Sequence, residues 1–263
     1  MAAIRTKPNS EYGVKTGIME KHHGRATNAF TLLELLLVIA IIAIVAALLV
    51  SVLSQGKRRA LNLRCVANLH QLGVGLQTFL ANDRGYPSRS QSTNADQPGS
   101  WMTQLEIGGL GVANPQGNFF VTGIWQCPAV QWYGQHTTDF MSYGYNAYGV
   151  LPVGNLTNSP GLLGHLGSGL GFRGIGESEV IAPSDMMAIA DCFDGSVYFM
   201  RISVTNLLRY GNTLTRHQGR GNVLFCDGHV ESPLLNYLME DRSDVALSRW
   251  NRDHQPHHEL LTP

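Results

Sequence analysis

The chain lacks an excess of charge of either sign. Its 263 residues include 19 Lys and Arg and 19 Asp and Glu, and charged residues make up only 14% of the total. Proteins that bind nucleic acid generally use a net basic surface to attract the phosphate backbone. We therefore expect no nucleic-acid partner for this protein.

The sequence also lacks the motifs of the common hydrolases. It contains no HExxH, no nucleophile elbow of the GxSxG type and no pair of acids in a recognisable context. None of its four cysteines forms a CxxC pair, so the cysteine spacing does not favour a structural zinc site. These absences favour a protein that is not an enzyme and needs no cofactor.

One long apolar run is present near the N-terminus. Leu35 to Leu53 contains nineteen residues, of which Ser51 is the only polar one. At about 1.5 Å per helical residue, this run is close to the roughly 30 Å hydrocarbon core of a bilayer. It is longer than the apolar region of a secretory signal and no small-x-small cleavage site follows it, so it predicts a single membrane span.

Charge flanks this run on both sides. Residues 1–29 carry five basic and two acidic side chains, a net charge of +3, which favours a cytoplasmic N-terminus. Lys57, Arg58 and Arg59 follow the run, however. Charge counting alone therefore leaves the orientation open.

Glu34 places a carboxylate near the start of the apolar run. A charged group in the hydrocarbon region costs free energy, which leaves two interpretations. The side chain could extend to the headgroups, or it could pair with a cation in an assembly. If the chain were cut before Phe30, a new α-amino group would appear four residues ahead of Glu34, and the amine of one subunit could neutralise the acid of its neighbour.

The stretch AFTLLELLLVIAIIAIVAALL resembles the N-terminal signal of type IV pilins and type II secretion pseudopilins. In that family a membrane peptidase cuts between a small residue, usually Gly, and Phe, and then N-methylates the Phe. The resemblance implies that Ala29 precedes the cut, that Phe30 is the new N-terminus and that Glu34 guides assembly. Ala29 departs from the usual Gly. Residues 1–29 are then a leader peptide and residues 30–54 a transmembrane assembly helix.

Residues 55–87 predict an amphipathic, soluble continuation of this helix. Apolar residues recur there at steps of three and four, at Cys65, Leu69, Leu72, Leu76, Phe79 and Leu80. No Pro interrupts residues 30–86, so both parts can form one rod that ends near Asn82, Gly85 and Pro87. The apolar stripe must pack against the globular domain that follows, over residues 88–250.

The C-terminal part of that domain predicts an antiparallel sheet. The pieces MMAIADC, SVYFMRI, GNVLFC and HVES are rich in strand-forming residues, and Asp227-Gly228 between two of them predicts a hairpin. Residues 88–180 predict short strands with long loops, and residues 251–263 a polar, frayed tail. The expected fold class is α+β: a long N-terminal helix packed on a C-terminal antiparallel sheet, pilin-like, with loop-rich insertions.

His217 is followed, after nine residues, by Asp227-Gly228. Together with RCVANLHQLG, WQCP and SYGYN, the segment 217–228 resembles pseudopilin-like proteins with a processing-associated H-x9-DG domain. His217, Asp227 and His229 could ligate a divalent cation, with Asp191 or Asp194 as further ligands. The alternative is a structural histidine and an Asp chosen for its turn geometry, which the Asp-Gly pair favours.

All four cysteines would lie beyond the membrane, where disulfides can persist. Cys65 and Cys127 occur in the family-like pieces RCVANL and QCP, whereas Cys192 and Cys226 end predicted strands. We expect Cys65 to pair with Cys127 and Cys192 with Cys226. The alternative is that at least two of them are buried free thiols.

The resemblance implies a structural pseudopilin subunit, processed by prepilin peptidase, in the bacterial inner membrane with a cytoplasmic N-terminus and a periplasmic globular domain. It would polymerise with its own copies or other pseudopilins into the pseudopilus of a type II secretion-like system. Its partners would include the inner-membrane secretion platform and membrane lipid. A type IV pilin of a surface filament, for adhesion or DNA uptake, is the alternative. A membrane-tethered metal-dependent enzyme is a remote one.

Overall fold

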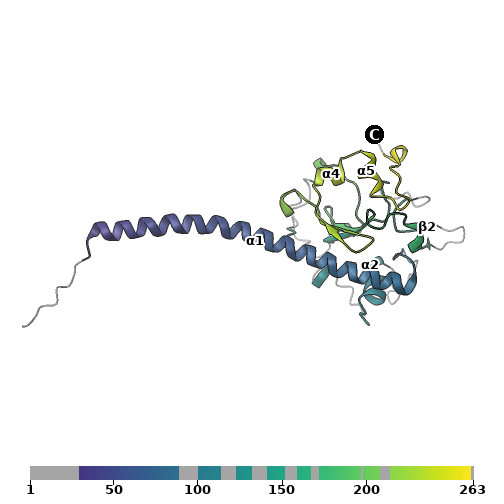
Figure 1. Cartoon of the computed structure of the whole chain (residues 1–263), viewed down its shortest axis with the longest axis horizontal. Helices are drawn as coiled ribbons and strands as arrows, with labels where there is room; N and C mark the ends of the chain where they lie inside the picture. Colours follow the sequence, from purple (N-terminus) through teal and green to yellow (C-terminus); the bar gives the residue numbers. More distant parts are fainter. Residues whose placement is uncertain are drawn as a thin grey trace, which may run out of the picture. The chain divides into compact units, whose positions relative to one another are not determined.

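A computed structural model describes residues 30–88, 100–113, 123–131, 141–151, 159–166, 172–196, 198–207 and 214–261 (Figure 1). The expected leader, including Ala29, lies outside the described residues. The chain divides into two compact units, Met1–Val50 and Ser51–Pro263.

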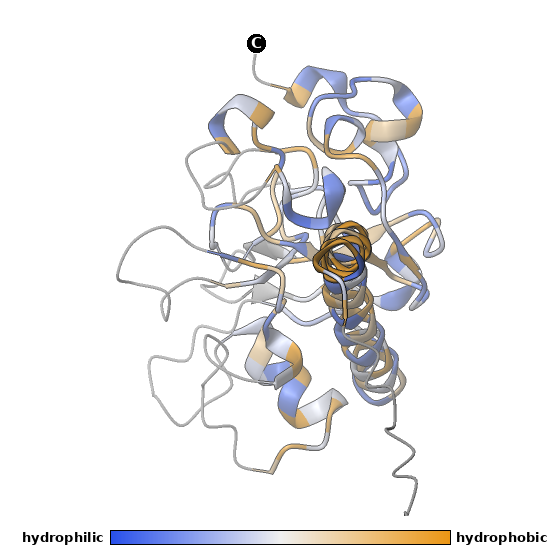
Figure 2. Ribbon diagram, turned by 90° about the vertical axis from the view of Figure 1, so that its left-hand side faces the viewer, coloured by the Kyte–Doolittle hydropathy of each residue, from blue (hydrophilic) through white to orange (hydrophobic). Residues whose placement is uncertain are grey.

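The first unit contains the start of helix α1 (Leu32–Asp83). Its apolar side chains are exposed, with fractions between 44% at Val38 and 80% at Leu32. Figure 2 colours the ribbon of this part of the helix orange, at the hydrophobic end of the scale. Among the described residues, α1 is the one helix that is long and apolar enough to cross a membrane.

The second unit contains the rest of α1, which continues without a break through Gly56. The predicted apolar stripe is buried here, from Cys65 to Leu80. The helix ends at Asp83, close to the predicted stop. The chain then turns back onto the domain, where Tyr86 N–H donates to the Ile175 carbonyl at 2.7 Å.

Four strands form the central antiparallel sheet in the order β1-β4-β5-β6: β1 (Tyr143–Tyr145), β4 (Met187–Asp191), β5 (Val223–Phe225) and β6 (Val230–Glu231). Two further strands, β2 (His165–Leu166) and β3 (Phe172–Arg173), form a separate antiparallel pair. The predicted hairpin joins β5 to β6, and Gly228 at its turn has φ of 96°. This conformation favours glycine because it has no Cβ.

The segment SVYFMRI does not form the predicted strand. In its described residues, pairing with the sheet is limited to one bridge between Tyr198 and Tyr145. Tyr198 N–H donates instead to Ser196 Oγ at 3.1 Å. Such local side-chain bonds compete with ladder formation, so the segment touches the edge of β1 and then leaves it.

Short helical turns complete the described fold: α2 (Trp101–Gln104), η1 (Leu105–Gly109), η2 (Gly123–Trp125), η3 (Glu177–Glu179), α3 (Val204–Leu207), η4 (Arg216–Gln218), α4 (Leu235–Met239), α5 (Asp244–Ser248) and η5 (His258–Leu260). Side chains alternate across β5: Leu224 joins the cluster that contains the α1 stripe, whereas Val223 and Phe225 join a second cluster with residues of α4 and α5. The sheet therefore separates the soluble half of α1 from the C-terminal helices, which confirms the predicted α+β architecture.

The C-terminal segment is not frayed over its described residues, contrary to expectation. Asn251 is 1% exposed, and its Oδ1 accepts a hydrogen bond from Val150 N–H at 3.1 Å. Arg252 N–H donates to the Pro160 carbonyl at 2.8 Å. Polar side chains thus fix this segment to the domain through backbone groups of an earlier loop, a use of polar residues that composition does not reveal.

Candidate functional site

Thr31 and Glu34 form a reciprocal cap at the start of α1. Thr31 Oγ1 accepts from Glu34 N–H at 3.2 Å, while Glu34 Oε2 accepts from Thr31 N–H at 2.9 Å and from the Thr31 hydroxyl at 2.8 Å. This is the capping-box arrangement, in which two N–H groups without helical partners are satisfied. Within one chain, the Glu34 carboxylate therefore already has a local role, and Phe30 directly precedes this cap.

His217 lies in a strained stretch of backbone before β5. His217, Gln218 and Gly219 have successive φ values of 54°, 60° and 77°. A non-glycine residue in this left-handed region costs roughly 1–2 kcal/mol, so two in a row require tertiary contacts that hold them there. Those contacts are made by the buried side chains of Arg216 and His217.

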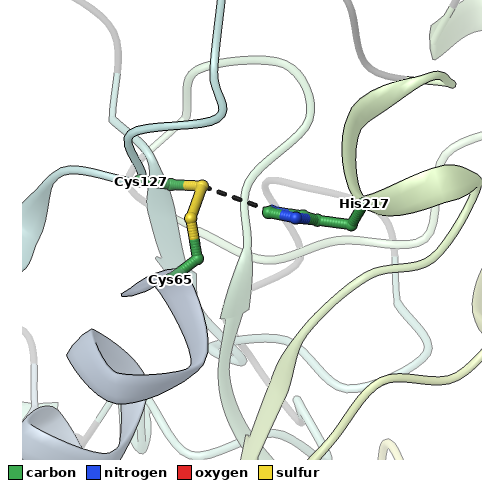
Figure 3. A group of neighbouring side chains, drawn as sticks. All are labelled: Cys65, Cys127 and His217. Atoms are coloured by element: carbon green, nitrogen blue, oxygen red, sulfur yellow. Dashed lines mark hydrogen bonds between the residues drawn. A yellow bond between two sulfur atoms is a disulfide. The ribbon is translucent and has the colours of Figure 1, made fainter. Parts of the chain in front are cut away.

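The His217 imidazole packs against a disulfide. The bond joins Cys65 of α1 to Cys127, which follows η2. Figure 3 shows the ring directed at the sulfur pair, with His217 Nε2 3.2 Å from Cys127 Sγ. The same Nε2 lies 3.4 Å from Asp191 Oδ2 at the end of β4. His217 thus connects α1, the loop after η2 and the central sheet.

Asp191 is the buried acid of this cluster. Its carboxylate accepts Asn222 N–H at 2.7 Å and lies 3.9 Å from Arg216 Nη2. Burial alone would raise the pKa of Asp191, but the Arg216 charge, His217 and the Asn222 N–H together hold that pKa below its usual value. Arg216 also donates to the Cys192 carbonyl at 2.8 Å. The buried ion pair and this hydrogen bond together connect η4 to the end of β4.

The expected metal set of His217, Asp227 and His229 is not brought together. Asp227 and His229 occupy the β5–β6 turn, where Asp227 Oδ1 lies 2.6 Å from His229 Nδ1 and both side chains are more than a third exposed. His217 is buried at the other end of β5. The strand itself separates them, so these three residues do not fit a divalent cation.

A different group of ligand atoms does gather in the described part of the chain. Cys65, Cys127 and His217 place their ligand atoms within 4.8 Å of one another. Both sulfurs are joined in the disulfide, however, and a disulfide offers no thiolate to a metal. Asp194, the other acid considered, accepts from Ser196 N–H at 2.9 Å in a local turn.

The second expected disulfide is absent: Cys192 and Cys226 are free and buried. The antiparallel register explains this, since Cys192 follows one end of β4 while Cys226 N–H donates to the Met186 carbonyl at the other end. The six residue steps from Met186 to Cys192 span about 20 Å along the strand. Burial, with Asp194 nearby, raises the pKa of the Cys192 thiol well above its usual value, and burial raises that of Cys226 to about 12.

The segment from His217 to Gly228 is attached to α1 along its length. Asn222 Nδ2 donates to Asn62 Oδ1 at 3.2 Å, and Gln77 Nε2 donates to the Cys226 carbonyl at 2.6 Å. A Cβ on Gly73 would lie 2.8 Å from Leu224 Cδ1, so the sheet approaches the helix closely only because this residue is glycine. These contacts were not predicted, although glycine inside a helix was a signal that could have found the last one.

Comparison with known proteins supports the N-terminal assignment. Residues 24–50 match the prokaryotic N-terminal methylation motif. The chain matches none of the curated proteins and none of the solved structures with which it was compared. The motif implies processing by a prepilin peptidase and polymerisation with pilin-like subunits. Together with α1 and the antiparallel sheet, it supports a pilin- or pseudopilin-like protein anchored in the inner membrane by a single helix.

Proposed function

We propose that this chain is a pseudopilin, a structural subunit of a type II secretion-like machine. Prepilin peptidase cleaves it between Ala29 and Phe30 and methylates the new N-terminus. The subunit then polymerises through the apolar half of α1, with its own copies or with other pseudopilins, on an inner-membrane platform. Its globular domain faces the periplasm. In this role it catalyses no reaction and needs no cofactor.

One observation carries the proposal: the methylation motif ends in a helix whose apolar side chains are exposed in the part of the chain that the structure describes. The motif spans residues 24–50, and the apolar residues from Phe30 to Leu53 are exposed. Such a surface requires a bilayer before assembly and neighbouring helices after it. Glu34 then meets a new α-amino group only after the leader has been cut.

The resemblance of the segment from His217 to Gly228 to pseudopilin-like proteins supports a pseudopilin over a pilin. A type IV pilin of a surface filament is the second candidate, because the N-terminal motif suits both. Deleting the gene separates them. We expect loss of secreted proteins with surface filaments retained, whereas loss of filaments with intact secretion would overturn the pseudopilin role.

Processing has its own test. N-terminal sequencing and mass spectrometry of the mature protein should begin at a methylated Phe30. Ala29→Gly, which restores the usual residue of the family, should be processed at least as fast, and Ala29→Leu should block the cut. A mature protein that begins at Met1 would refute processing.

A further inference from the structure

A basic groove lies beside His217 in the second unit. It has a volume of ≈ 930 Å³, within the range of ligand-binding pockets. Arg58 and Arg59 of α1 contribute to its lining, as do Arg216 and Arg220 from the segment around η4. None of the lining residues that the structure describes is acidic.

Most of this positive charge has no carboxylate partner in the described part of the chain. Among the residues that the structure describes, Arg216 is the one groove arginine with a carboxylate partner, Asp191 at 3.9 Å. Arg220 Nη1 donates to the Ser232 carbonyl at 2.7 Å, and no carboxylate of the described residues pairs with its charge. Gathering like charges costs free energy, and an anion in the groove would offset that cost.

The inner wall also holds donor capacity that the described protein does not use. Arg216 is 3% exposed, and its Nε has no hydrogen-bond partner among the described residues. A guanidinium nitrogen can only donate, so the missing partner of Arg216 must be an acceptor such as a phosphate oxygen.

The position of the groove along α1 identifies the source of that anion. Gln55 at the groove is two residues beyond Leu53, the last residue of the apolar run, and Leu53 is 69% exposed. Lipid headgroups lie immediately beyond the hydrocarbon core. The groove is also lined by Leu61 and Leu63, which offer apolar contact beside the arginines. Free phosphate or an acidic peptide would not need this placement.

We propose that this groove binds the phosphate of an anionic phospholipid headgroup, held by Arg58 and Arg59 at the entrance and Arg216 at the inner wall. The planar guanidinium group of arginine can donate two parallel hydrogen bonds to two oxygens of one phosphate. This function is independent of polymerisation, so a monomer in detergent should show it.

The test uses the full chain in a neutral detergent, titrated with micelles that contain phosphatidylglycerol or phosphatidylcholine, and native mass spectrometry to count retained lipid. We expect preferential binding of phosphatidylglycerol. Arg58→Gln and Arg59→Gln should each weaken it about fivefold, the usual effect of one basic residue at an anionic surface. Both arginines are exposed on α1, so these variants should fold.

Lys57→Gln is the matched control, because Lys57 precedes Arg58 on the same helix but does not line the groove. It should leave the binding unchanged. Equal weakening by Lys57→Gln would show diffuse surface attraction and overturn the proposal. If inorganic phosphate is retained and phosphatidylglycerol is not preferred over phosphatidylcholine, the ligand is free phosphate. That result would overturn the lipid assignment.

Discussion

His217 and Asp191 face each other in the core, with His217 Nε2 3.4 Å from Asp191 Oδ2 and both side chains almost completely buried. Arg216, the residue before His217, completes the charge balance of Asp191. A short sequence before β5 therefore supplies both groups that hold one buried acid. This arrangement gives His217 a structural role that does not require a metal.

Replacing Asp191 should strongly destabilise the folded protein. Asp191→Asn leaves the buried Arg216 charge without its partner, and breaking a buried pair in this way typically costs about 3–5 kcal/mol of unfolding free energy. Denaturant unfolding of the full chain in detergent, followed by tryptophan fluorescence, measures the change. Asp227→Asn at the exposed turn is the control and should cost less than about 1 kcal/mol, since Asn also suits turns. Equal effects at both positions would contradict the assigned role.

The same acid predicts the direction of a pH effect. The folded-state pKa of Asp191 lies below its ordinary value of 3.8, so its stabilisation is present above that value. It is lost as the pH falls through the folded-state pKa, because the unfolded chain then binds the proton more readily. We expect the stability difference between the wild-type chain and Asp191→Asn to shrink under acid. A constant difference down to strongly acidic pH would contradict the ionised pair.

The four cysteines should divide into two classes. Alkylation of the native, non-reduced protein should label neither Cys192 nor Cys226, because both thiols are buried and their raised pKa values keep them protonated at neutral pH. Unfolding should expose both thiols while Cys65 and Cys127 remain linked. Mass spectrometry of the digested protein reads this pattern.

Removing the disulfide should destabilise the domain. The bond closes a loop of 62 residues, and the chain-entropy model gives about 4 kcal/mol for a loop of that size. A double replacement by Ser measures this contribution, and a serine at Cys226 alone provides a control for a buried thiol outside the bond. A loss no greater than that of the control would mean that packing alone holds Cys127 against α1.

Two glycines of α1 should respond in opposite ways to alanine. A Cβ on Gly73 would meet Leu224 Cδ1 at 2.8 Å and the Gly228 carbonyl at 3.2 Å, so Gly73→Ala should cost about 1–3 kcal/mol through overpacking. A Cβ on Gly56 would meet nothing within 4 Å, so Gly56→Ala should stabilise the helix by about 0.5–1 kcal/mol. Thermal unfolding of the two variants checks the sign of each effect.

The cap that Glu34 forms with Thr31 and its proposed assembly contact can be separated by substitution. Glu34→Val removes the carboxylate and should leave cleavage intact while it reduces incorporation into fibres, about tenfold for a contact of roughly 1.4 kcal/mol. Thr31→Val removes the capping partner, worth about 1 kcal/mol to the helix, but keeps the carboxylate. It should assemble normally. If Thr31→Val assembles as poorly as Glu34→Val, the cap rather than an intersubunit pair explains the effect.

The spacing of apolar residues and the turn residues predicted the elements whose conformation depends on neighbouring residues in the sequence. The stripe from Cys65 to Leu80 and the Asp227-Gly228 hairpin both follow from spacing and turn chemistry within a few residues. The cluster around Asp191 could not be predicted in this way. Its members come from β4, η4 and α1, and strand register decides which of them meet.

The dependence on long-range contacts also explains the predictions that differ from the structure. Cys192 and Cys226 each end a strand, but antiparallel pairing places those ends at opposite sides of the sheet. His217 and Asp227 are close in sequence, yet β5 lies between them. Residues 251–261 look like a solvent-exposed tail by composition and are held by backbone groups of a distant loop. In each case the deciding contact is long-range.

The Cys65–Cys127 bond has a mechanical consequence. A load applied along α1 during fibre extension would reach the globular domain through a covalent link as well as through side-chain packing. Packing contacts can slide or separate under tension, whereas a disulfide holds until it is reduced. The helix and its domain would thus remain coupled even when the surrounding contacts yield.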